Sequence, residues 1–118
     1  MNIEDFRNYC LAKKGVEETF PFDEVTLVFK VVNKMFALTG LNADEFRVNL
    51  KCDPEKSVEL RELHVDIIPG WHMNKKHWNT VYFEKELDDE LLFELIDHSY
   101  DLVVKGLKKK DRLFLKNL

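Results

Sequence analysis

Apolar residues recur at helical spacing near both ends of the chain. Ile3, Phe6 and Cys10 fall on one face of a helix for which Asn2 is a suitable N-cap. Over residues 88–104, apolar pairs return every three or four positions, which is the buried stripe of an amphipathic helix. The pattern therefore predicts a short opening helix and a longer closing helix.

The first half of the intervening chain is patterned as strands. Residues 27–32 and 35–41 are mostly apolar, and the Asn33-Lys34 pair between them suits a tight hairpin. Residues 18–22 predict a short strand before this hairpin. Pro21 confines that strand to an edge or a strand end, because proline cannot donate a ladder hydrogen bond.

Two more strands are predicted further along the chain. Residues 46–51 alternate strictly between apolar and polar side chains, so this strand has one face of each kind. Its polar face carries Arg47, Asn49 and Lys51. Residues 77–83 predict the last strand, in which Trp78 and Tyr82 point away from the core. Capping of the core edge is the alternative role for Trp78.

A helix is predicted between these two strands. Asp53-Pro54 is a strong helix start, because aspartate caps the first turn and proline is favoured at its first position. We expect the helix to extend to about Leu63 and to bury Val58, Leu63 and part of Leu60. Residues 67–70, Ile-Ile-Pro-Gly, predict a turn, since adjacent proline and glycine interrupt both helices and strands.

This order of elements predicts an α+β two-layer sandwich, in which the helices pack on one face of an antiparallel sheet. No repeat, low-complexity tract or linker interrupts the chain, so we expect residues 1–118 to form a single domain. The other sheet face is then open, and Lys30 joins the polar side chains of residues 46–51 there.

The composition is typical of a globular domain, with 45% hydrophobic and 34% charged residues. No apolar run approaches the ~18 residues that span a bilayer. The acidic start lacks the basic and apolar regions of a signal peptide. Cys10 and Cys52 have no CxxC spacing and are expected to be reduced thiols. We therefore expect a cytoplasmic protein that does not associate with membranes.

The formal net charge of −4 is unevenly distributed. Residues 105–118 hold six basic side chains and one acidic one, which leaves an acidic body of −9 over residues 1–104. Such a basic end could contact a phosphate backbone. It could equally form the solvated last turns of a helix, where cations interact favourably with the helix dipole.

Four stretches of the chain together resemble the MmcQ/YjbR family. They are GVEETFPFDEVTLVFKVVNKMFAL (15–38), RVNLKCDPE (47–55), IPGWHMNKKHWNTV (68–81) and LIDHSYDLVV (95–104). The resemblance covers nearly the whole chain. It implies a double-wing fold, similar in layout to the frataxin-like sandwich, and a DNA-binding role.

Residues 71–81, WHMNKKHWNTV, are the most unusual stretch. His72 and His77 could ligate a metal together with Cys52 or Asp53, but their spacing is not that of a helical pair and a third ligand is only guessed. A Cys52 nucleophile would need one of these histidines as its base. No glycine-rich phosphate loop, GxSxG or HExxH motif is present. We expect no metal, no cofactor and no catalytic residue.

Contact with nucleic acid is the functional hypothesis for this stretch, and a polar turn with a structural role is the alternative. Cationic and amide side chains can donate to phosphates, and an exposed tryptophan can stack on a base. The predicted surface joins the open sheet face to the loop, through Arg47, Asn49, Lys51, Trp71, His72, Asn74, Lys75, Lys76 and His77. The predicted partner is DNA; a module that binds a small anion or another protein through the same surface is the alternative.

Overall fold

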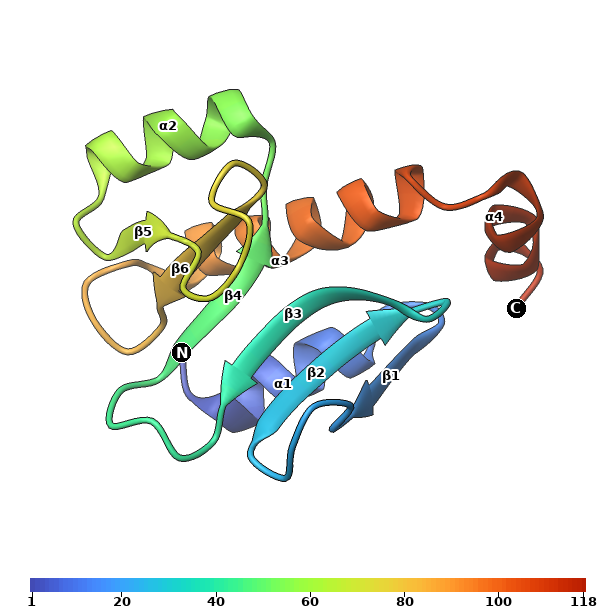
Figure 1. Ribbon diagram of the computed structural model, residues 1–118, viewed down its shortest axis with the longest axis horizontal. Coiled ribbons are helices and arrows are strands. Elements are labelled where there is room, and N and C mark those ends of the chain that lie inside the picture. Colours follow the sequence, from blue (N-terminus) through green and yellow to red (C-terminus); the bar gives the residue numbers. More distant parts are fainter.

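The computed structural model describes residues 1–118 as one six-stranded antiparallel sheet with four helices (Figure 1). The spatial order of the strands is β1-β2-β3-β4-β6-β5. Along the chain the elements are α1 (Ile3–Leu11), β1 (Val16–Thr19), β2 (Thr26–Val31), β3 (Lys34–Gly40), β4 (Arg47–Lys51), α2 (Pro54–Leu63), β5 (Ile67–Pro69), β6 (Trp78–Tyr82), α3 (Asp89–Lys105) and α4 (Lys109–Lys116). None of the four helices combines the length and the apolar character that a membrane span needs.

A single core of 20 buried residues fills the space between one sheet face and the helices. α1 and α3 lie on this face (Figure 1), and Phe6 of α1 packs edge-on against Phe29 and Phe83. α2 contributes Leu60 to the same core, and α4 contributes Leu115. The predicted α+β sandwich is therefore confirmed.

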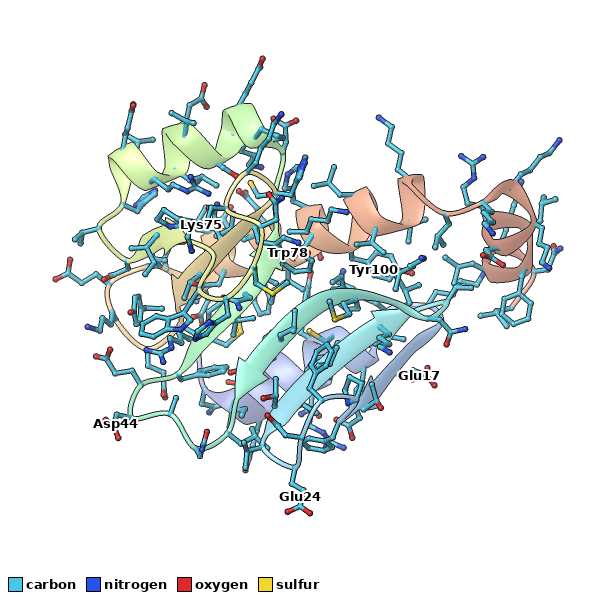
Figure 2. All side chains as sticks on the ribbon, viewed as in Figure 1. Glu17, Glu24, Asp44, Lys75, Trp78 and Tyr100 are labelled. Atoms are coloured by element: carbon cyan, nitrogen blue, oxygen red, sulfur yellow. The ribbon has the colours of Figure 1, made fainter.

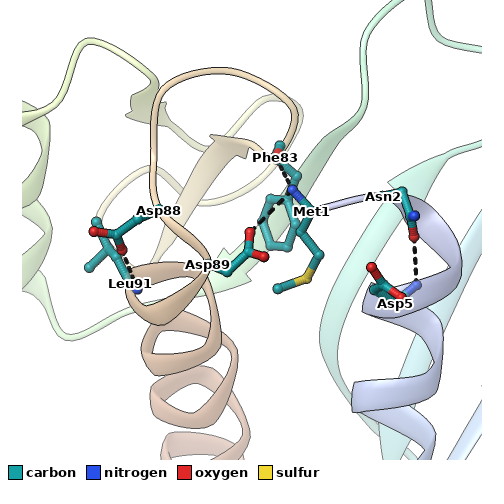
Figure 3. A network of polar contacts seen from close by, with 7 residues as sticks. All are labelled: Met1, Asn2, Asp5, Phe83, Asp88, Asp89 and Leu91. Atoms are coloured by element: carbon teal, nitrogen blue, oxygen red, sulfur yellow. Dashed lines mark hydrogen bonds and ion pairs between the residues drawn. The ribbon is translucent and has the colours of Figure 1, made fainter.

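Side-chain caps define where the two predicted terminal helices begin (Figure 3). Asn2 accepts a hydrogen bond from the Asp5 backbone, and Asp88 accepts one from Leu91. The amino nitrogen of Met1 donates to the Phe83 carbonyl oxygen at 2.8 Å and lies 3.4 Å from an Asp89 carboxylate oxygen. These contacts connect the start of α1 to the start of α3.

The β2–β3 hairpin turns one residue earlier than predicted. Val31 pairs with Lys34, so the turn consists of Val32 and Asn33 rather than Asn33-Lys34. Both turn residues have positive φ angles, 46° and 66°, as a type I′ turn requires. The register also shifts between Phe29 and Lys30, which produces a bulge.

The predicted boundaries were wrong at two edge strands. β1 covers Val16–Thr19 and ends before Pro21, whereas residues 18–22 were expected to form it. Residues 67–69 form strand β5 rather than part of a turn. Pro69 is tolerated there because β5 lies at the sheet edge and pairs only with β6.

The helix over residues 54–63 was predicted correctly, but its buried face was not. Val58 and Leu63 are exposed, while Ser57 and Leu60 are buried. The Ser57 hydroxyl lies 3.4 Å from the buried Asn79 amide, so a polar contact helps to fix the rotation of α2. The basic C-terminal segment is also not a continuation of α3, because it forms the separate helix α4 (Figure 1).

The opposite sheet face carries a small apolar cluster of its own. Trp78, Val28 and Leu38 are buried there, and Met73 packs over them from the β5–β6 connection. The prediction that Trp78 points away from the main core is confirmed by its pairing with Lys51. Its side chain is nevertheless only 9% exposed, because the connection folds back over it.

Arg61 of α2 supports this connection from the side. Its Nε donates to the Asn79 Oδ1 atom at 2.7 Å. Its Nη2 donates to the carbonyl oxygens of Lys75 and Trp78. No carboxylate pairs with the guanidinium, so all three of these acceptors are neutral. A planar guanidinium can reach several acceptors at once, which a lysine ammonium on a single flexible stem cannot do in the same geometry.

We predict that Arg61→Ala lowers the free energy of unfolding by about 1–3 kcal/mol, because it leaves the buried Asn79 Oδ1 atom without a donor. Arg61→Lys should recover only part of this loss. Chemical denaturation followed by tryptophan fluorescence measures both effects. Glu62→Ala, an exposed neighbour on the same helix, is the control, and an equally small effect for Arg61→Ala would contradict the role assigned to Arg61.

His98 of α3 gives the fold a pH dependence. Its Nε2 accepts the Asp53 backbone N–H at 3.1 Å, which requires the unprotonated ring. Burial, and then the nearby Lys56 ammonium, lower the pKa of His98 below its ordinary 6.5. A lowered pKa means that the unfolded chain takes up the proton more readily than the folded protein does. This contribution to stability is therefore present above about pH 6.5 and is lost as the pH falls through the lowered value.

We predict that the wild-type protein loses more unfolding free energy between about pH 7.5 and about pH 5.5 than His98→Gln, which can accept the same hydrogen bond without titrating. Urea denaturation at the two pH values tests this, with His64→Gln as the control. Parallel pH profiles for the wild type and His98→Gln would show that His98 does not cause the dependence.

Candidate functional site

The β5–β6 loop, residues 70–77, is fixed to the open face of the sheet by a ring of hydrogen bonds. The Trp71 N–H donates to the Thr80 hydroxyl oxygen at 2.8 Å, and that hydroxyl donates to Asn49 Oδ1 at 2.5 Å. The Asn49 amide then donates to the Trp71 carbonyl oxygen at 3.1 Å. Thr80 and Asn49 are paired residues of neighbouring strands, so the sheet itself positions the backbone of Trp71.

Gly70 is required where the loop begins. A β-carbon at this position would lie 2.8 Å from the Trp78 Cβ and 2.9 Å from the Trp78 carbonyl oxygen. The backbone therefore approaches β6 more closely than any larger residue allows. Two residues later His72 has a φ of 58°, a left-handed conformation that is uncommon outside glycine. Together these features produce a sharp reversal that directs the side chains of Trp71 and His72 outward.

The second half of the loop organises its own backbone. Asn74 Oδ1 accepts from the backbone N–H groups of Lys76 and His77, at 3.0 and 3.3 Å. The Lys75 ammonium donates to the Gly70 carbonyl oxygen at 2.9 Å. The structural role that was the alternative for this loop is thus present for Asn74, while Lys75, Lys76 and His77 are exposed.

Trp71 is the most prominent side chain of the loop, being 46% exposed although its backbone is fixed. The Arg47 guanidinium lies 4.5 Å from the centre of its ring, a cation–π contact that restricts both side chains. The centre of the His72 ring is 5.6 Å from the centre of the Trp71 ring. Aromatic and cationic groups are therefore presented together in a defined arrangement.

A groove of about 520 Å³ runs from this loop across the sheet towards the β1–β2 and β3–β4 connections. Its volume is within the range of ordinary small-ligand sites. Its wall on the loop side is formed by Trp71, His72 and Met73. The remaining lining consists of Phe22, Thr26, Met35, Leu38, Thr39, Gly40, Asn42, Ala43, Arg47 and Asn49.

Charge is divided between the two ends of this groove. Arg47, Lys51, Lys75 and Lys76 form no ion pair, so their charges are not neutralised within the protein. At the far end, Asp23 and Glu24 follow the lining residue Phe22, whereas Asp44 and Glu45 lie just before Arg47 in the chain and Glu45 pairs with Lys85. Figure 2 shows Glu24 and Asp44 at the lower edge of the molecule, well away from Lys75.

The structure brings many, but not all, of the predicted site residues into one place. Arg47, Asn49, Trp71 and His72 line the groove, and Asn74, Lys75, Lys76 and His77 complete the adjoining loop. Lys51 lies at the other end of β4, opposite Trp78. The sequence reasoning missed Phe22, which is 64% exposed and lines the groove. Its position between Pro21 and Asp23 was a signal of a loop rather than a strand.

Both thiol groups are buried, whereas the nucleophile hypothesis requires an accessible Cys52 thiol with a histidine as its base. Cys52 belongs to the main core, whereas His72 and His77 are exposed in the loop. Burial raises the pKa of the Cys52 thiol, and burial raises that of Cys10 to about 12. No group of three or more histidine, cysteine, aspartate or glutamate side chains could hold a metal ion.

Comparisons with known proteins agree with this architecture. A protein from Deinococcus radiodurans, DR2400, has a crystal structure that superposes with a TM-score of 0.90 at 46% identity, over 98% of this chain and 88% of that one. A crystal structure of a Pseudomonas syringae protein matches with a TM-score of 0.74 at 30% identity, over 86% of this chain and 98% of the other.

The sequence comparisons name the family. The family model YjbR matches residues 11–102. The uncharacterized protein YbdF of Escherichia coli O157:H7 is 43% identical over 92% of this chain and 89% of its own. The uncharacterized protein YjbR of Escherichia coli K12 is 36% identical over the full length of both chains. The chain belongs to the YjbR family.

Proposed function

We propose that this protein binds DNA through the open face of its sheet and has no catalytic activity. The observation that carries the proposal is the fixed, half-exposed Trp71, with Arg47 at 4.5 Å from its ring and Lys75 beside it in the loop, neither of them neutralised by a carboxylate. Cations of this kind can neutralise phosphates and release counterions, while an exposed aromatic ring can stack on a base. The two kinds of contact are complementary, because phosphate contacts position a nucleic acid and base contacts can add selectivity.

Preorganisation supports the same proposal. The ring of hydrogen bonds through Thr80 and Asn49 holds the Trp71 backbone, and Arg61 holds the far end of the loop. A loop that is ordered before binding loses less conformational entropy when a ligand arrives. The absence of catalytic activity is proposed because burial raises the pKa of both thiols, which leaves little of the nucleophilic thiolate.

A second candidate function is a module that binds a small anion or another protein. It is favoured by the acidic body, because excess negative charge opposes a long polyanion more than a small ligand. The charge of the groove lining fits this candidate as well, since Arg47 is its only lysine or arginine. Ligand binding whose affinity falls much less steeply with salt concentration than DNA binding does would favour this second function.

We predict that replacing Lys75 and Lys76 together with alanine weakens DNA binding at low salt and makes its salt dependence shallower. Each phosphate contact contributes a slope of about −0.9 on duplex and about −0.7 on single strands in a plot of log affinity against log salt. Loss of two contacts should therefore change the slope by roughly 1.5 units, with all base sequences affected alike. Fluorescence anisotropy with labelled oligonucleotides at several salt concentrations measures this slope.

The matched control changes the net charge equally at a distant place. Lys109→Ala together with Lys110→Ala on α4 removes two exposed cations outside the proposed surface. An equal change of slope for both double variants would show that overall charge, or α4, makes the contact. No change of affinity for the loop variant at low salt would overturn the proposal and favour the second candidate.

A further inference from the structure

We infer that the groove receives one unpaired nucleotide of a single strand, with its base between Trp71 and Phe22 and its phosphate beside Arg47 and His72. This inference rests on the proposed DNA-binding function and specifies the form of nucleic acid that the site takes. It follows from three features of the groove: its shape, its two aromatic side chains and the division of charge along it.

The shape favours an unpaired base. The volume of about 520 Å³ is suited to a small ligand, and the groove is bordered by a loop on one side and by two strand connections on the other. A base that is already paired and stacked in a duplex is not available to enter such a site unless it is extruded, which costs unstacking and unpairing energy. An unpaired base does not incur the pairing cost.

The two aromatic side chains come from opposite ends of the strand order. Phe22 belongs to the β1–β2 connection and Trp71 to the β5–β6 loop, yet both line the groove. Both are well exposed, at 64% and 46%. The space between them is lined by apolar side chains such as Leu38 and Met35 and by the amides of Asn42 and Asn49. Apolar surface with a few amide groups suits a planar heterocycle, which has aromatic faces and a polar edge.

The division of charge gives the ligand a direction. The Arg47 guanidinium lies 4.5 Å from the centre of the Trp71 ring, and no carboxylate pairs with it. A phosphate is therefore expected at this end, beside His72 and the lysines of the loop. At the Phe22 end, hydrogen bonds from the Val25 and Thr26 backbone hold the pKa of Asp23 below its usual value, so its carboxylate remains ionised near neutral pH.

The same acidic end opposes a rigid duplex. A duplex laid along the groove would bring phosphates of both strands towards Asp23 and Glu24. Like charges in close proximity disfavour this arrangement, and duplex DNA carries one charge per about 1.7 Å of its axis. A flexible single strand can place one phosphate at the cationic end and turn away from the carboxylates. The groove therefore favours single strands over duplexes.

The inference is tested by titrating the protein with three probes at low ionic strength. They are an oligonucleotide of about twelve thymidines, a fully paired hairpin of similar length, and thymidine monophosphate. Quenching of tryptophan emission reports on the site, because a bound base can stack on the exposed Trp71 but not on Trp78, which is only 9% exposed. We expect the single strand to quench this emission and to bind at least about tenfold more tightly than either other probe, since it combines base stacking with phosphate contacts.

Phe22→Ala is the decisive variant, and Phe20→Ala is its matched control. Both side chains are exposed, but only Phe22 lines the groove. Loss of one base–aromatic stack should weaken single-strand binding by between about fivefold and about a hundredfold and leave hairpin binding unchanged. Phe20→Ala should have no effect on either probe. Circular dichroism of both variants should match the wild type, because neither side chain is in the core.

The possible failures are distinguishable. If the hairpin binds as tightly as the single strand and Phe22→Ala changes neither, this inference is overturned while the proposed DNA binding stands. If thymidine monophosphate binds as tightly as the strand, the groove is a small-molecule site and the inference is also overturned. If none of the probes binds, the proposed function fails and this inference fails with it.

Discussion

The architecture of the site depends on the two hydrogen bonds made by the buried Thr80 hydroxyl. This hydroxyl accepts the Trp71 N–H and donates to Asn49, whose amide returns to the Trp71 carbonyl oxygen. Every polar group in this ring is satisfied, which is the condition under which buried polar contacts fix one arrangement. Thr80 and Asn49 are paired residues of β6 and β4. The sheet therefore fixes the position of the loop backbone at Trp71.

Contacts elsewhere in the β5–β6 loop add to the support that this ring of hydrogen bonds gives to Trp71. Gly70 lets the chain approach β6, Met73 covers Trp78, and Arg61 anchors the far end of the loop through carbonyl groups. The exposed Trp71 is thus supported by elements on both sides of the sheet. A mutation in α2 can affect the proposed binding surface although α2 lies away from the groove.

The sequence predicted those parts of the fold that depend on local periodicity. Strict alternation over residues 46–51 correctly placed Arg47, Asn49 and Lys51 on the open face, and the caps Asn2 and Asp53 marked true helix starts. These features could be recognised because each depends on residues close together in the chain. The family resemblance then indicated the same two-layer arrangement.

What could not be predicted depends on contacts between distant segments. The rotation of α2 follows partly from the Ser57–Asn79 contact, which a count of apolar residues cannot reveal. β5 forms because β6 is available beside it, whereas its own three residues end in proline. Likewise, the alternation along the strand predicted on which face of the sheet Trp78 lies. Its burial could not be predicted, since Met73 covers it from the β5–β6 connection. The contribution of Phe22 to the groove required the relative positions of three connections, which periodicity does not encode.

The central claim is that the open-face groove, and not the basic α4 helix, contacts a single strand of nucleic acid. Amide and side-chain chemical-shift mapping by NMR during titration with a single-stranded oligonucleotide tests it most directly. The account predicts that perturbations concentrate at Phe22, in residues 42–49 and in residues 71–77, including the Trp71 indole N–H. Perturbations confined to Lys109–Lys116, or the absence of any perturbation at low salt, would contradict it.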